Sequence, residues 1–126
     1  MRLFGMRYGY YPLDLTEQYR VDFISDAFYP LINATGAVFY AGDKQKELLM
    51  ELFEKKLPAF IKLIQPELDK GGWLVGNKLT IADYWVGKLY TDLAINPNSY
   101  GRAEWAAFLK KNPKFEQFGK RFFAEN

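Results

Sequence analysis

One predicted helical segment, residues 80–95, is apolar around almost its whole circumference. Its apolar side chains are Ile81, Ala82, Tyr84, Trp85, Val86, Leu89, Tyr90 and Leu93. A helix at a protein surface keeps one polar face, so a helix without one has to be covered on all sides. We therefore predict that this segment is the central helix of a bundle. No segment shows the period-two alternation of a strand, and the predicted fold class is all-α.

A long helix is predicted before the central one. It begins at Asp14 as N-cap, with Glu17 at the spacing of a capping box, and continues towards Tyr40. Pro30 lies inside it and is expected to kink it, because proline has no backbone N–H and its ring crowds the preceding turn. Residues 1–8 are predicted to form a separate short helix that ends at Gly9.

Three further helices are predicted around the long helix and the central helix. Gly42 and Asp43 should end the long helix and cap the next, which has an apolar stripe and is expected to be kinked at Pro58. Residues 73–75 form an extended apolar segment before the central helix. Two helices then complete the chain, marked by Trp105, Phe108 and Leu109 and by Phe115, Phe118, Phe122 and Phe123.

The composition excludes several kinds of chemistry. The 126 residues contain no cysteine and no histidine, which removes disulfides, thiolate chemistry, the usual zinc ligands and a serine–histidine relay. The net charge is +2 with acidic and basic residues interleaved, and nucleic-acid binding needs a clustered basic surface. No apolar run reaches the length of a membrane span, and the N-terminus lacks a secretory signal. We expect a cytoplasmic protein that binds no metal, nucleic acid or membrane.

The start of the central helix carries a recognisable motif, Gly76-Asn77-Lys78-Leu79-Thr80-Ile81-Ala82-Asp83-Tyr84. Thr80 is predicted to accept a hydrogen bond from the backbone N–H of Asp83, whose carboxylate returns to the N–H of Thr80. Leu79 is expected to pack on Tyr84 as a hydrophobic staple. A buried helix start cannot leave its first N–H groups unpaired. We therefore interpret Asp83 as a structural cap and not as a catalytic acid.

Together with the preceding Trp-Leu-Val segment, this motif resembles the signature of the helical C-terminal domain of cytosolic glutathione transferases, in the style of the sigma, pi, alpha and mu classes. Residues 1–9 resemble the last helix of that family's thioredoxin-like domain, and residues 10–126 resemble its helical domain. Residues 17–22 with Asp26 are similar to the start of the family's long first helix. Asn112-Pro113-Lys114 is similar to a helix start near the end of the family domain.

The resemblance implies a division of labour between two domains. In the family, the thioredoxin-like domain binds glutathione and supplies the residue that stabilises its thiolate, while the helical domain supplies an apolar wall for the electrophile and much of the dimer interface. Those glutathione-binding residues would precede Met1. We therefore assign no catalytic residue and no cofactor to this chain, and we expect it to be inactive without the other domain. Glutathione is the co-substrate of the full-length family.

The resemblance also places substrate-binding positions on two helices. Asn33, Ala37 and Tyr40 on the long helix and Trp85 on the central helix match wall positions for a small hydrophobic ligand. Asp26 matches a family carboxylate and is a candidate for glutathione contact across a dimer. In several classes, an aspartate one turn further along makes that contact, and Pro30 replaces it here.

Two functions remain open at this point. The first is the helical half of an enzyme that conjugates glutathione to small electrophiles. The second is a non-catalytic interaction or scaffold module, as in elongation-factor gamma subunits and synthetase-associated proteins. Either function predicts a homodimer or a hetero-complex through the long helix. There, Tyr19, Phe23 and Val38 are expected to lie apart from the apolar stripe through Ile24, Phe28 and Leu31 that faces the core.

Overall fold

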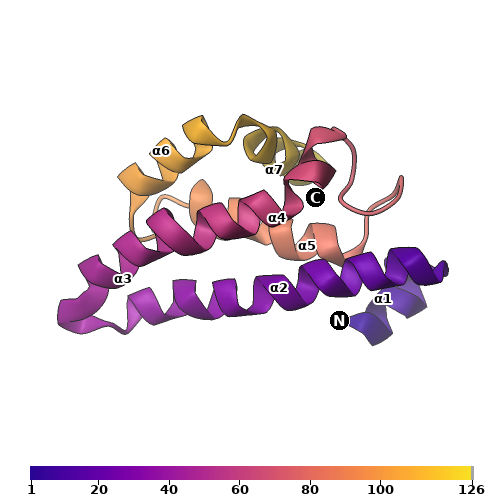
Figure 1. Ribbon diagram of the computed structural model, residues 1–126, viewed down its shortest axis with the longest axis horizontal. Coiled ribbons are helices and arrows are strands. Elements are labelled where there is room, and N and C mark those ends of the chain that lie inside the picture. Colours follow the sequence, from indigo (N-terminus) through magenta and orange to yellow (C-terminus); the bar gives the residue numbers. More distant parts are fainter. Residues whose placement is uncertain (126) are drawn as a thin grey trace.

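The computed structural model describes residues 1–125, and every regular element in that range is helical (Figure 1). No helix in these residues is long and apolar enough to cross a membrane. The α-helices are α1 (Arg2–Tyr8), α2 (Leu15–Phe39), α3 (Gln45–Glu51), α4 (Leu57–Asp69), α5 (Ile81–Lys88), α6 (Arg102–Lys111) and α7 (Pro113–Glu125). A 3-10 turn, η1 (Gly42–Lys44), precedes α3, and two π-helical segments, η2 (Leu52–Lys56) and η3 (Leu89–Ala94), follow α3 and α5.

The helix α2 forms one long edge of the molecule, and α3 and α4 return along it (Figure 1). The buried residues of α2 recur every three or four positions and form a single stripe: Val21, Ile24, Phe28, Leu31, Thr35 and Val38. Our placement of Val38 off this stripe was wrong. Val38 lies 14 residues after Ile24, or nearly four full turns, so its side chain returns to the core face and is 2% exposed.

The start of α2 has the expected cap, whereas the connection after it differs from the prediction. The Asp14 carboxylate accepts a hydrogen bond from the backbone N–H of Glu17 at 3.0 Å. At the other end, α2 stops at Phe39, and Asp43 lies within η1 instead of capping a helix. Lys44 occupies the N-cap position of α3 without a side-chain hydrogen bond.

A π-helical turn interrupts the helix that contains Pro58. Because Pro58 has no backbone N–H, the carbonyl of Glu54 cannot form its usual bond to the residue four positions later. The helix widens at this point, and the backbone N–H of Leu57 donates a hydrogen bond to the carbonyl of Leu52, five residues back. The sequence indicated a kink at Pro58, and the structure accommodates the proline through this wider turn.

The central helix is α5 with η3, and it is buried along most of its length. Val86 and Leu89 are fully buried. Two glycines allow close contact with α7, because a Cβ at Gly87 would collide with the ring of Phe122, and one at Gly119 would collide with the ring of Tyr90. One side of this helix is nevertheless polar, since Lys88 and Asp92 are exposed and form an ion pair at 3.0 Å. The helix is therefore not covered all round.

Candidate functional site

The Asp83 carboxylate organises the start of the central helix. Its Oδ2 accepts hydrogen bonds from the backbone N–H of Thr80 at 2.8 Å and from the Thr80 hydroxyl at 3.2 Å, and its Oδ1 accepts one from the backbone N–H of Leu74 at 2.8 Å. Thr80 completes the capping box by accepting from the backbone of Asp83. Asp83 thus fixes the preceding apolar segment as well as the helix, a connection that the sequence analysis missed.

Burial dominates the electrostatics of this carboxylate. Asp83 is 0% exposed, and desolvation raises its pKa to about 6, against the hydrogen bonds from Leu74 and Thr80 that favour the ionised form. Leu79 is half-buried. The ring of Tyr84 meets those of Tyr10 and Phe122 edge to face, at centroid distances of 5.4 and 5.5 Å. The staple between Leu79 and Tyr84 stays a prediction.

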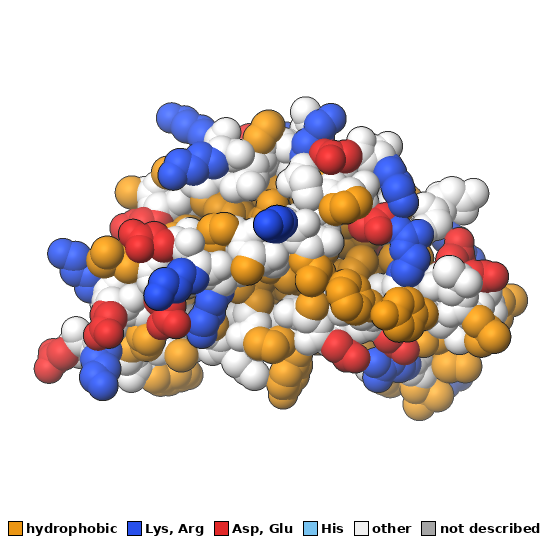
Figure 2. Space-filling model, viewed as in Figure 1, with side chains coloured by type: hydrophobic (Ala, Val, Ile, Leu, Met, Phe, Trp, Pro, Cys, Tyr) orange, Lys and Arg blue, Asp and Glu red, His pale blue; other side chains and the backbone are white. Residues whose placement is uncertain are grey.

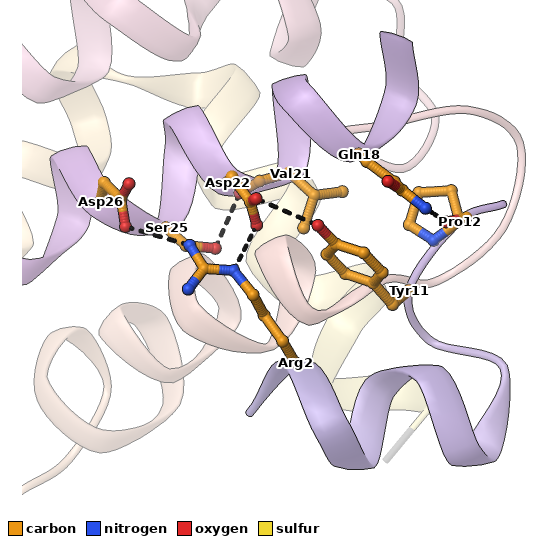
Figure 3. A network of polar contacts seen from close by, with 8 residues as sticks. All are labelled: Arg2, Tyr11, Pro12, Gln18, Val21, Asp22, Ser25 and Asp26. Carbon is orange, nitrogen blue, oxygen red and sulfur yellow. Dashed lines mark hydrogen bonds and ion pairs between the residues drawn. The ribbon is translucent and has the colours of Figure 1, made fainter. Parts of the chain in front are cut away.

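A polar network ties α1 to α2 (Figure 3). The guanidinium of Arg2 donates to Asp22 at 2.7 Å and reaches Asp26 at 3.5 Å, and the Tyr11 hydroxyl donates to the other oxygen of Asp22 at 3.0 Å. Burial, together with the bond to Asp22, raises the pKa of Tyr11. Asp26 therefore has a partner within the chain, although its side chain remains 75% exposed.

Backbone and packing contacts complete the attachment of α1. The N–H of Ile81 donates to the carbonyl of Tyr10 at 2.9 Å. Gly5 is the buried residue of α1, and a Cβ there would lie 2.9 Å from the Ile81 side chain. Gly9 ends the helix in the left-handed region with φ 81°. The short helix is thus held directly against the start of the central helix.

The outer surface of α1 is apolar and uncovered. Its side chains of Leu3, Phe4, Met6 and Tyr8 are 60–74% exposed. Apolar side chains gather around α1 and along the outer edge of α2 (Figure 2). A small hollow of about 180 Å³, lined by residues that include Phe4 and Tyr8, lies between α1 and the start of α5. A helix that is firmly attached and still exposes large apolar residues has the character of a docking surface.

The predicted wall residues, together with Asp26 as the predicted glutathione contact, fall into two groups. Asp26, Asn33 and Ala37 are exposed and lie on one side of α2, opposite its core stripe, and Tyr40 is 93% exposed at the end of that helix. Trp85 is half-buried, and its ring lies 5.8 Å from that of the core residue Phe28. The structure brings the α2 residues together on one surface. Trp85, which belongs to α5, instead lies against the core side of α2.

These features define a class of protein: an all-helical domain with a buried, capped central helix and an attached short helix that exposes apolar side chains. Residues 31–126 match the family described as Glutathione S-transferase, C-terminal domain. Because this match covers most of the chain, the chain belongs to that family. No curated protein and no solved structure matched it.

Proposed function

We propose that this chain is the helical domain of a glutathione transferase that conjugates glutathione to small electrophiles. The observation that carries the proposal is α1, which is fixed to the domain by Arg2 and Gly5 while its apolar side chains remain uncovered. A thioredoxin-like domain docked on this surface would cover those side chains. It would also supply the glutathione site that the family resemblance assigns to it.

In this proposal, the exposed side of α2 forms the wall of the electrophile site. Asn33 offers a polar group, while Ala37 and Tyr40 offer apolar and aromatic surface, and all three are exposed. The docked domain would hold the glutathione thiolate, whose sulfur forms a bond to the electrophilic carbon as the leaving group departs. The part of this chain is to desolvate and orient the apolar electrophile beside that sulfur.

The test is glutathione conjugation to 1-chloro-2,4-dinitrobenzene. We expect no turnover above the uncatalysed rate for this chain alone, and turnover when it is joined to the thioredoxin-like domain of a glutathione transferase. In the joined protein, Tyr40→Ala should raise KM for the electrophile and leave KM for glutathione unchanged. Lys110→Ala, at an exposed position on α6, is the control. Turnover by the chain alone, or an inactive joined protein that still binds glutathione, would contradict the proposal.

One observation favours the second function, a non-catalytic interaction module. Pro30, which is exposed on α2, replaces the aspartate that resemblance to the catalytic classes leads one to expect there. A joined protein that neither binds glutathione nor conjugates it, but is recovered as a stoichiometric complex with another protein, would support the module. A glutathione-affinity column followed by intact-complex mass measurement distinguishes the two outcomes.

A further inference from the structure

A cleft of about 700 Å³ lies between the η2–α4 segment and α6. Its apolar lining comes from Phe53, Ile61 and Phe108, with Pro58 and Ala107 beside them. Ile61 and Phe108 are only 4% and 5% exposed, so this surface is anchored in the core. The cleft shares none of its lining with the outer faces of α1 and α2, and the proposed function does not use it.

The π-helical turn helps to shape this cleft. Phe53 and Glu54 both belong to η2, where the wider turn changes the direction of the side chains relative to an α-helix. The Phe53 ring lies 4.8 Å from that of Trp105 and 6.3 Å from that of Phe108, both edge to face. These contacts join η2 to α6. A π turn is an uncommon feature that recurs at functional sites in proteins.

Charges of opposite sign occupy the two ends of the cleft. The helices α4 and α6 run in the same direction (Figure 1), and the ring contact between Phe53 and Trp105 places η2, just before α4, beside the first half of α6. Glu54 and Glu104 therefore lie at one end of the cleft, and Lys62 and Lys111 lie at the other. The rise of an α-helix puts about 10–12 Å between the two ends.

None of these four side chains forms an ion pair with another residue in the range 1–125. The ion pairs of this part of the chain lie elsewhere on the surface. Each end thus combines two like charges that form no ion pair with residues 1–125. Two carboxylates attract a cation, two ammonium groups attract an anion, and the aromatic surface between them favours an apolar body. The cleft matches a molecule that carries opposite charges at its two ends.

We propose that this cleft binds a zwitterionic molecule with an apolar body, of the kind represented by a tripeptide of apolar residues with free ends. Its ammonium group would lie between Glu54 and Glu104, and its carboxylate between Lys62 and Lys111. The length agrees, because three extended residues span about 10 Å. The open cleft and exposed charges indicate modest affinity, with specificity that depends on both charged ends.

The probe is the tripeptide Ala-Phe-Leu with free ends, titrated into the ¹⁵N-labelled chain and followed by amide chemical shifts. We expect shifts at Gln65 and Ala107, which line the cleft, and none around α1. N-acetylation or C-amidation should each weaken binding about threefold to fivefold, the effect of losing one exposed charge pair. Equal affinity for the free and blocked peptides would overturn the proposal, as would shifts confined to another surface.

Variants then test which charged residues bind each end of the peptide. Lys111→Gln should reduce the affinity for the free peptide to that for the C-amide, with no further loss for the C-amide itself. Glu104→Gln should behave in the same way towards the N-acetyl peptide. Lys110→Gln, next to Lys111 but outside the cleft, is the matched control and should bind as the unaltered chain does. An N-acetyl peptide that binds as tightly as the free one would show a site for anions alone and overturn the zwitterion.

Discussion

At the scale of single residues, Asp83 connects three parts of the domain. Its two oxygens accept hydrogen bonds from the backbone N–H of Leu74 and from the backbone N–H and hydroxyl of Thr80. The carboxylate thus links the apolar segment at Leu74, the N-cap residue Thr80 and the first turn of the central helix. The group is fully buried, so water cannot replace it as an acceptor. The contribution of this carboxylate is therefore the pairing of donors that would otherwise be buried without a partner.

We expect Asp83→Ala to lower the free energy of unfolding by about 2 kcal/mol or more, because buried N–H groups at Leu74 and Thr80 lose their acceptor. Urea unfolding followed by circular dichroism measures the change. Asp69→Ala, at an exposed position at the end of α4, is the control and should change stability by less than about 0.5 kcal/mol. A similarly small change for Asp83→Ala would show that water reaches the helix start.

The raised pKa of Asp83 also predicts a dependence of stability on pH. Between about pH 4 and pH 6, the folded chain keeps a proton on Asp83 that the unfolded chain has released. The contribution of Asp83 to stability is therefore greatest below pH 4 and falls as the pH rises to about 6, by about 3 kcal/mol.

Urea unfolding at several pH values tests this dependence when the unaltered chain is compared with Asp83→Asn. The other carboxylates contribute equally to both proteins and cancel in the difference. A stability difference that stays constant from pH 4 to pH 7 would mean that the hydrogen bonds to the carboxylate outweigh its burial.

At the scale of elements, two glycines set the distance between the central helix and α7. Gly87 faces the ring of Phe122, and Gly119 faces the ring of Tyr90. Each helix therefore presents its backbone to an aromatic side chain of the other. Alanine would favour the helical conformation at either position, but its methyl group has no room.

We expect Gly87→Ala and Gly119→Ala each to lower the free energy of unfolding by about 1–3 kcal/mol through overpacking. Gly36→Ala in α2 is the matched control, because a Cβ there meets nothing within 4 Å. That variant should be neutral or more stable by up to about 1 kcal/mol, since glycine is a poor helix former. Thermal unfolding of the three variants compares them directly, and a loss at Gly36 equal to the others would contradict the packing argument.

Local sequence signals were sufficient for most elements but not for all of them. Asp14, Gly9 and Pro113 mark the ends of helices correctly because caps and helix-start prolines act over a few residues. The π turns were missed, since only Pro58 hinted at one of them. Phe123 was placed with the other aromatic residues of α7 but is 59% exposed.

The functional surfaces were less predictable than the helices. Helical periodicity is enough to place Asn33 and Ala37 on one side of α2. The cleft between α4 and α6 joins residues about 50 positions apart, such as Phe53 and Phe108. Their proximity depends on how whole helices pack, which no short pattern in the sequence reports.

At the scale of the whole molecule, α2 presents an apolar stripe to the outside. Tyr19 and Phe23 are 69% and 46% exposed, and their rings stack at a centroid distance of 6.2 Å. Ala27 and Pro30 continue the stripe at helical spacing and line a groove of about 330 Å³ between α2 and α4. An apolar stripe that leads into a groove is suited to association with a second protein surface.

We predict that the chain forms a homodimer through this stripe, because a two-fold axis across a helix brings the same apolar residues of both copies together. Sedimentation velocity at micromolar concentration should show a dimer for the unaltered chain. Phe23→Lys should shift the population to monomers, since it places two like charges in a desolvated contact. Phe123→Lys, at an exposed aromatic position on α7, is the control and should leave the dimer intact. A monomer at all concentrations would exclude self-association of the isolated chain, and a dimer that tolerates Phe23→Lys would place its interface elsewhere, with the apolar face of α1 as the next surface to test.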